Sequence, residues 1–363
     1  MAASERLRAH LLAGQVIPAH PLALDERRTL DERHQRAMTR YYVDAGAGGL
    51  AVGVHTTQFR IRQPQHDLYR PVLELATEAV REKLESAPRP FAMVAGLVGD
   101  TAHAVREAEL ARSLGYDAGL LSLGAWRDAT DDAVLAHCRA VADTIPLFGF
   151  YLQPAVGGRE LSFRFWSGFA QIPDVVAIKI APFDRYRTID VVRALAEAGR
   201  DDVALYTGND DSIIVDLLTP FPVQVKGRAG ERRMVGGLLG QWAVWTRRAV
   251  ELLEEIRALR GSGVAGEEVR QARAGTSDEW LRRAAALTDA NAAIFDAAHG
   301  FAGSIPGIHE VLRRQGLLRG IWCLDPAETL SPGQREEIDR VVRQYPELAD
   351  DAWVAARLDS WLA

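Results

Sequence analysis

Eight short, continuous apolar runs recur along the chain, separated by longer stretches with helical periodicity. Because apolar residues fill these runs instead of alternating with polar ones, the pattern is typical of parallel strands buried on both faces. Several of the intervening stretches begin at Asp or Thr and end at Gly, as helices do. Eight strand–helix units predict an α/β fold of the (β/α)8 TIM-barrel type. The runs lie at residues 15–22, 48–54, 91–99, 117–123, 146–154, 175–182, 203–209 and 234–240.

The alternative architecture is a doubly wound open sheet, which usually carries a glycine-rich phosphate loop after its first strand, and none is present here. The sequence does not decide which segment is the eighth strand, because TPFPVQVKGRAGERRM at 219–234 could form a hairpin, a loop insertion or the strand itself. After the eighth run the chain is helical except for a GSGVAGEE linker. We therefore expect a catalytic barrel at 1–260 and a C-terminal helical appendage at 261–363, packed on the barrel.

Charge and composition exclude some classes of function. The chain has 43 Lys and Arg residues against 49 Asp and Glu, a net charge of −6, so no basic excess is available to neutralise nucleic-acid phosphates. Its two cysteines, Cys138 and Cys323, cannot make a disulfide framework. The first residues lack the apolar segment of a signal peptide, and no apolar run reaches the roughly 18 residues of a membrane span. We expect a cytoplasmic protein that binds neither nucleic acid nor membrane.

Lysine is rare in this chain, with Lys83, Lys179 and Lys226 the three lysines among 43 basic residues. Arginine cannot lose its proton and serve as an amine nucleophile, so a retained lysine needs a local reason. Lys179 lies inside the apolar run VVAIKIAP, where burial disfavours the ammonium form. A lysine of lowered pKa near the carboxyl end of a barrel strand is what Schiff-base catalysis requires. The alternatives are a rim lysine, one paired with Asp184 or Asp210, and the weaker candidate Lys226.

Other strand ends also carry polar groups. Tyr151 ends the run before that of Lys179, where its phenol could relay protons or simply be a rim aromatic. Thr56 and Thr57 follow GGLAVGV and could hold a carboxylate or merely cap a helix. His55 could act as an acid or base, although a lone histidine is more often structural. We expect no metal, because no ligand spacing links the candidate ligands at strand ends, which are His20, His55, Asp184 and Asp210.

In their order and spacing these motifs resemble the dihydrodipicolinate synthase / N-acetylneuraminate lyase superfamily of class I aldolases and lyases. The resemblance covers roughly residues 14–345. VHTTQF is similar to the family's Gly-Thr-Thr-Gly-Glu turn, FYLQPAVGG to its Tyr-Asn-x-Pro strand, and VVAIKIAPFDR to its Gly-Ile-Lys-Asp strand. LYTGNDD is similar to its Ser-Gly-Asp-Asp turn, MVGGLLGQ to its late glycine-rich strand, and SIPGIHEVLRRQGLL to its proline-containing helix after the barrel.

The resemblance implies a Schiff-base aldolase or lyase acting on pyruvate or a pyruvate-derived adduct, breaking or forming a carbon–carbon bond, with or without dehydration. It makes Lys179 the residue that condenses with the 2-keto acid and Tyr151 the proton relay, helped by Thr57. It makes Thr56 and Thr57 the binding site of the carboxylate, and brings the Gly208 backbone close to the substrate. Further substrate contacts are expected from His55, Trp126 and Asn209.

The chain also departs from the family pattern. The Gly and Glu residues that flank the family's Thr pair are gone. Trp126 stands where the synthases place a second tyrosine, Val156 where they keep an arginine for the second substrate's carboxylate, and Ile180 where an acidic residue follows the lysine. These changes argue against dihydrodipicolinate synthase itself and favour a bulkier, less anionic second substrate. A non-catalytic ligand-binding barrel and a metal-dependent barrel enzyme are the alternative functions.

The resemblance further implies a homodimer or homotetramer whose other partners are a small-molecule 2-keto acid and an aldehyde-type substrate. It implies no cofactor beyond the covalent lysine adduct. Trp242, Trp245 and Trp280 lie on helices after the barrel, where exposed aromatic side chains suit an interface. Burial of these tryptophans against the barrel wall is the equal alternative.

Overall fold

The computed structural model describes residues 3–225, 227–261 and 277–363. Eight parallel strands form one sheet in the order β1-β10-β7-β6-β5-β4-β3-β2. A parallel bridge between Ala19 and Ala51 joins its two edges, so the sheet closes into the predicted (β/α)8 barrel. The strands are β1 (Val16–Pro18), β2 (Gly49–Val52), β3 (Ala92–Leu97), β4 (Ala118–Leu121), β5 (Leu147–Leu152), β6 (Val175–Ala181), β7 (Ala204–Thr207) and β10 (Gly236–Leu239).

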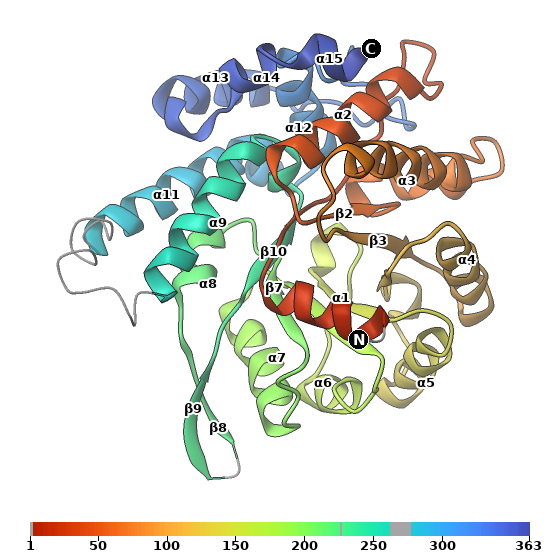
Figure 1. Cartoon of the computed structure of the whole chain (residues 1–363), viewed down its shortest axis with the longest axis vertical. Coiled ribbons are helices and arrows are strands. Elements are labelled where there is room, and N and C mark those ends of the chain that lie inside the picture. The colour runs from red at the N-terminus through yellow and green to blue at the C-terminus, as the bar shows by residue number, and fades with distance from the viewer. Residues whose placement is uncertain (1–2, 226, 262–276) are drawn as a thin grey trace.

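Helices follow the strands and cover the outside of the barrel (Figure 1). Many begin as the sequence predicts, since the side chains of Asp31, Asp100 and Thr130 accept hydrogen bonds from backbone N–H groups of the first turn. The covering helices are α2 (Glu32–Ala45), α3 (Tyr69–Ser86), α4 (Thr101–Ser113), α5 (Asp131–Ala142), α6 (Phe163–Phe169), α7 (Arg185–Glu197), α8 (Ile213–Leu218) and α9 (Thr246–Gly261).

The segment 219–234 forms an antiparallel hairpin of β8 (Phe221–Val225) and β9 (Arg228–Arg232), outside the barrel sheet. Figure 1 shows this hairpin reaching away from the barrel. MVGGLLG therefore supplies the eighth barrel strand as β10. The polar alternation of VQV fits an exposed ribbon, whereas the continuous apolar run fits a strand covered on both faces.

The two faces of the barrel sheet pack into separate apolar clusters. One fills the barrel interior and includes Phe148, Phe150 and Tyr206, and the other lies between the strands and the outer helices and includes Tyr151 and Trp166. Helix α1 (Ala3–Leu12) adds Leu7 and Leu11 to the interior cluster and closes the amino-terminal end of the barrel. The carboxyl-terminal end is left for a ligand, as in other barrels of this type.

The chain after residue 276 is helical and packs against the barrel helices, with α15 beside α2 and α11 beside α8 (Figure 1). Trp361 anchors the end of this region, because it is buried and its indole N–H donates to Asp44 at 2.7 Å. The GSGVAGEE linker lies largely outside the described residues. The helices are α11 (Ser277–Ile294), α12 (Ser304–Arg314), α13 (Gln334–Gln344), α14 (Asp351–Ala355) and α15 (Leu358–Leu362).

The tryptophans considered for an interface are buried within the chain. Trp242 is fully buried, and Trp245 and Trp280 are 2% and 7% exposed, so their interpretation as exposed interface residues is wrong. They fill the apolar layer between α9, α11 and the barrel strands. Cys138 and Cys323 are buried free thiols. Within the described ranges, no helix is both long and apolar enough to span a membrane.

Candidate active site

Lys179 lies on β6, two residues before the strand ends, and its side chain faces the barrel interior. It pairs in register with Phe150 of β5, and its Nζ atom lies 4.6 Å from the centre of the Phe150 ring. Nothing in the described chain forms a hydrogen bond or ion pair with the ammonium. Burial lowers the pKa of Lys179 from 10.5 to about 8, against the opposing effect of the Asp210 charge. The structure thus holds a buried, unpaired amine that loses its proton easily.

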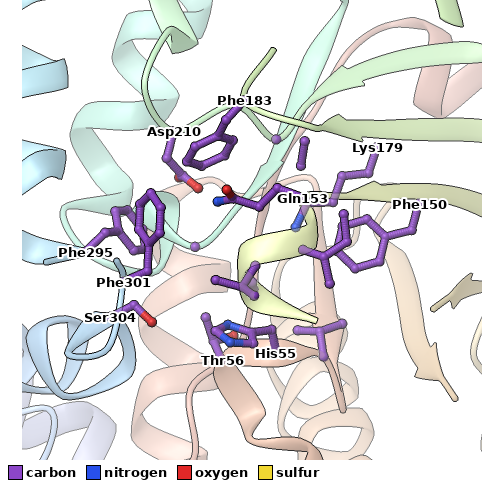
Figure 2. Close-up of a pocket in the computed structure, with 17 residues that line it drawn as sticks. His55, Thr56, Phe150, Gln153, Lys179, Phe183, Asp210, Phe295, Phe301 and Ser304 are labelled. Atoms are coloured by element: carbon purple, nitrogen blue, oxygen red, sulfur yellow. The ribbon is translucent and has the colours of Figure 1, made fainter. Parts of the chain in front are cut away.

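The Lys179 amine opens into a cavity at the carboxyl-terminal end of the barrel (Figure 2). The cavity measures about 70 Å³ and is partly open to solvent. Polar and aromatic side chains from the barrel and from the C-terminal region share its wall. They include His55, Thr56, Phe150, Gln153, Lys179, Phe183, Asp210, Phe295, Phe301 and Ser304.

Asp210 is the carboxylate of this cavity. It lies after β7, and one of its oxygens accepts a hydrogen bond from the Gln241 N–H at 3.2 Å. Its backbone oxygen accepts from the Asn291 amide at 2.6 Å, which fixes the turn from the C-terminal side. Burial raises the pKa of Asp210 to about 7, although the nearby Lys179 charge acts in the opposite direction. Asp210 can therefore hold or release a proton near neutral pH.

Three predicted substrate contacts do line the cavity. Burial and the Lys179 charge lower the pKa of His55 to about 4, so its ring is neutral at pH 7. The Thr56 hydroxyl donates to the backbone oxygen of His20 at 3.3 Å beside the cavity. Gly208 lies against the lysine itself, since a Cβ atom there would come within 2.7 Å of Lys179 Cε. Only a glycine leaves the lysine chain its space at this position.

Thr57 and Asn209 lie behind the cavity wall and do not line it. The Thr57 hydroxyl accepts from the Gly53 and Val54 N–H groups and donates to the His20 oxygen at 2.6 Å, so it holds the turn that presents Thr56. The Asn209 carboxamide accepts from the Phe183 N–H at 3.0 Å and donates to Asp216 at 2.9 Å. The polar atoms of both side chains form hydrogen bonds with backbone groups and with buried side chains.

Trp126 is also outside the cavity wall. Its indole N–H donates to the Gly99 oxygen at 3.2 Å, and its ring stacks on His137 with the ring centres 4.6 Å apart. Its backbone oxygen accepts a hydrogen bond from Arg159. The tryptophan is a packing residue of the loops after β3 and β4 in this structure, rather than a substrate contact.

Tyr151 faces away from Lys179, and the prediction that the two converge is wrong. Register pairs Tyr151 with Ile180, so both side chains leave the barrel on its outer face. The phenol lies 3.2 Å from the Leu161 oxygen and 3.3 Å from Arg187, and its ring packs on Trp166 of α6. Successive strand residues point to opposite faces, so Phe150 takes the interior position beside the lysine.

The residues that sequence reasoning missed are Phe150, Gln153, Phe183 and the C-terminal residues of the wall. Gln153 and Phe183 follow directly after β5 and β6, the position at which barrel enzymes carry functional groups, so their place along the chain was a usable signal. Phe295, Phe301 and Ser304 lie far along the chain and carry no local pattern that predicts a site.

No three His, Cys, Asp or Glu side chains of the described residues lie together in a way that could hold a metal ion. His20, one of the strand-end histidines, bonds through its ring to Thr39 and to the Pro21 oxygen. Asp184 caps α7 by accepting from the Tyr186 and Arg187 N–H groups. The polar atoms of His20 and Asp184 therefore form hydrogen bonds within the fold.

A profile of the dihydrodipicolinate synthetase family matches residues 13–219, more than half of the chain. The chain belongs to this family. Among its curated relatives is the 4-hydroxy-tetrahydrodipicolinate synthase of Aromatoleum aromaticum, 27% identical over 210 residues that make up 57% of this chain and 65% of that protein. The synthase of Methylococcus capsulatus is 26% identical over 204 residues, 55% of this chain and 65% of that protein. The matches thus span just under two thirds of these relatives.

Solved structures of the family share the fold over nearly the whole chain. Dihydrodipicolinate synthase from Oceanobacillus iheyensis superposes with a TM-score of 0.69 at 18% identity, covering 95% of this chain and 99% of that one. N-acetylneuraminate lyase from Fusobacterium nucleatum gives a TM-score of 0.67 at 16% identity, covering 92% and 99%. The low identities fit a divergent member of the family.

Proposed function

We propose that this protein is a Schiff-base-forming aldolase or lyase that acts on a 2-keto acid, pyruvate or an adduct of pyruvate. The observation that carries the proposal is Lys179, a buried and unpaired amine that opens into a cavity at the catalytic end of a barrel. The amine attacks the ketone carbon, water leaves, and the resulting iminium accepts the electrons of a neighbouring carbon–carbon bond. No cofactor is needed for these steps.

Because its pKa is low, Lys179 supplies a neutral amine as the nucleophile. Because burial lowers the pKa of Lys179 to about 8, a larger fraction of its amine is neutral at pH 7 than in an ordinary lysine, whose pKa is near 10.5. Gly208 leaves room for the lysine chain, and Phe150 supplies the apolar surface below it. The site therefore supports imine formation at neutral pH without a metal.

Asp210 is our candidate for the proton carrier in place of Tyr151. The reaction needs a group that gives a proton to the departing hydroxyl and takes one back later. No described cavity residue is a tyrosine or cysteine, and the pKa of about 4 leaves His55 a weak proton donor at pH 7. Asp210 faces the cavity with a pKa of about 7, close to the working pH. Thr56 is placed to bind the keto-acid carboxylate, with Thr57 holding its turn.

Borohydride trapping tests the proposal. The intact protein is incubated with pyruvate, reduced, digested and examined by mass spectrometry at each of its three lysines. We expect an adduct on Lys179 and none on Lys83 or on Lys226, which lies outside the described residues, and no adduct in Lys179→Ala. An adduct on Lys226, or no adduct with any of several 2-keto acids, would contradict the proposal and favour a ligand-binding or metal-dependent barrel.

We also propose that the chain assembles as a homodimer or homotetramer, as the family resemblance implies. One solved relative is described as a monomeric dihydrodipicolinate synthase variant, so the assembly needs its own measurement. Light scattering on the purified chain should give a mass of two or four chains. A single-chain mass at micromolar concentration would contradict this part of the proposal.

A further inference from the structure

We propose that the second substrate of this site is a neutral aldehyde that carries an aromatic or similarly flat apolar group, held among phenylalanine rings at the cavity wall. This inference rests on the proposed function, because it concerns the partner that reacts with the keto-acid adduct of Lys179. Three features of the cavity support it: the rings themselves, the charges around them and the backbone that carries them.

Four phenylalanines reach the cavity from three segments, namely β5, the loop after β6 and the connection between α11 and α12 (Figure 2). Phe150 lies under the lysine amine, and Phe295 lies so close to Gly240 that a Cβ there would come within 3.1 Å of its ring. Phe183 and Phe301 meet edge to face, with ring centres 5.7 Å apart and an angle of 82° between their planes. Rings in such arrangements attract further aromatic groups beyond simple area burial.

The charges of the cavity disfavour an anionic second substrate. Lys179 is the one Lys or Arg side chain among the described cavity residues, although 43 residues of the chain are Lys or Arg. That lysine is consumed in the covalent bond to the first substrate, and no other Lys or Arg side chain lines the described wall. A second carboxylate in this space would be buried without a cation, which is costly. Val156, also in the wall, is apolar.

The two loops that carry the facing rings are built to hold them. Phe183 has a φ of 52° and Phe301 a φ of 70°, a left-handed conformation that is rare and strained for large side chains. Such strain persists only where the surroundings enforce it. Asn209 enforces it at Phe183 by accepting its N–H. Asp296 does so at Phe301, since its backbone oxygen accepts from that residue's N–H at 3.0 Å.

Asp296 is itself fixed on several sides. Its carboxylate accepts from the Gly303 N–H at 2.9 Å and from the Ser331 hydroxyl at 2.5 Å, and it pairs with His299 at 2.6 Å. This network orders residues 296–303 and so positions Phe301. Gln153 and Ser304 supply polar groups elsewhere on the same wall, and in Figure 2 the Gln153 amide points into the space that Lys179 and Asp210 also face. The wall thus offers both polar and aromatic groups, with Phe150 beside the Lys179 amine itself.

The bond-forming step needs no further reactant. The enamine carbon of the Lys179–pyruvate adduct attacks the aldehyde carbon, and the aldehyde oxygen takes a proton from Asp210. Water then adds to the iminium carbon and releases a 4-hydroxy-2-keto acid, which returns the lysine to its free amine. The reverse sequence cleaves the same product.

The test compares three aldehydes with pyruvate on the wild-type protein, namely benzaldehyde, acetaldehyde and the anionic succinic semialdehyde. We expect kcat/KM for benzaldehyde to exceed that for acetaldehyde by about tenfold or more, and that for succinic semialdehyde by on the order of a hundredfold. Reductive trapping of the same mixtures should show the mass of the benzaldehyde–pyruvate product on Lys179.

Phe301→Leu and Phe183→Leu should each lower the preference for benzaldehyde over acetaldehyde by about tenfold, measured as the ratio of the two kcat/KM values within each variant. Tyr186→Ala is the matched control, because this aromatic residue lies three positions from Phe183 but is 85% exposed. Equal or greater activity with succinic semialdehyde, or a pyruvate adduct that accepts none of the aldehydes, would overturn the inference. Absence of the pyruvate adduct would instead overturn the proposed function, so the two failures are distinguishable.

Discussion

Lys179 is a single residue in which burial serves chemistry at the expense of stability. Its amine lies over the face of the Phe150 ring, has no hydrogen-bonding partner in the described chain, and has Asp210 as the nearby countercharge. An unpaired buried cation is unfavourable, and active sites are where such arrangements are retained. The burial of Lys179 should affect the rate of adduct formation, the pH dependence of that rate and the stability of the protein, and each of these can be measured.

The rate of pyruvate-adduct formation should rise with pH around a midpoint near 8, because the neutral amine of Lys179 is the proposed nucleophile. Asp210→Asn removes the charge that raises the lysine pKa, so the midpoint should move to lower pH while turnover falls. Stopped trapping at a series of pH values measures both midpoints. A midpoint near 10.5 in the wild type would contradict the assigned environment of the lysine.

Lys179→Met should raise the melting temperature at pH 7. The folded-state pKa of about 8 lies below the unfolded value of 10.5, so the unfolded chain binds more protons between these values and wild-type stability rises with pH across that window. The gain from the substitution is therefore full below pH 8 and shrinks toward pH 10.5. Calorimetry in an Asp210→Asn background isolates the lysine, whose window there begins below pH 8 because the Asp210 charge no longer raises its pKa. A loss of stability at pH 7 in that background would refute the argument.

At the scale of elements, two features determine which side chains line the cavity. One is the alternating direction of side chains along β5, and the other is the closeness of β6 to β7. Phe150 and Tyr151 are neighbours in sequence, yet one faces the lysine and the other packs under α6. A shift of one residue exchanges the faces of a strand, and the apolar run of β5 allows either choice. The glycine that follows β7 then leaves space for the lysine chain.

Gly208→Ala should slow pyruvate-adduct formation by roughly a hundredfold, since the new methyl group would displace Lys179 Cε, from which an ideal Cβ lies 2.7 Å. Gly230→Ala is the control, because a Cβ there meets only Val223 at 3.9 Å in the exposed hairpin. Trapping rates and circular dichroism spectra of both variants are compared. An unchanged rate in Gly208→Ala would mean that the lysine chain has freedom the structure does not suggest.

At the scale of the whole molecule, the C-terminal helices complete the site. They deliver Phe295, Phe301 and Ser304 to the cavity and supply the Asn291 amide that fixes the Asp210 turn. Their far end is held by Trp361, which packs against Tyr41 of α2 with ring centres 5.5 Å apart. The wall therefore depends on contacts between distant parts of the sequence, such as the Asn291–Asp210 hydrogen bond and the Phe183–Phe301 ring contact.

Trp361→Ala should lower the free energy of unfolding by about 3–5 kcal/mol, because it empties a buried site and leaves Asp44 without its indole donor. Leu281→Ala, at a residue 61% exposed in α11, should change it by less than about 0.5 kcal/mol. Urea denaturation of both variants measures the difference. Equal midpoints would show that the C-terminal anchor contributes little to the fold.

Much of the architecture followed from local sequence alone. Eight continuous apolar runs predicted eight strands buried on both faces, because strand burial leaves a pattern within each segment. The same reasoning singled out Lys179, since a lone lysine in an apolar run stands out, and Thr56, which follows a strand, whereas Gly208 came from the family resemblance. Local signals of this kind need no knowledge of distant contacts.

Tertiary structure decided what local pattern could not. Which face of β5 turns inward depends on its register with β6, so Phe150 rather than Tyr151 meets the lysine. Whether VQV or VGGLL closes the barrel depends on which segment pairs with β1. The aromatic wall depends on a C-terminal loop that folds back over the barrel. No pattern in the sequence around Phe301 predicts this contact. Register and long-range packing are set by the whole chain, so the site became visible only in the folded molecule.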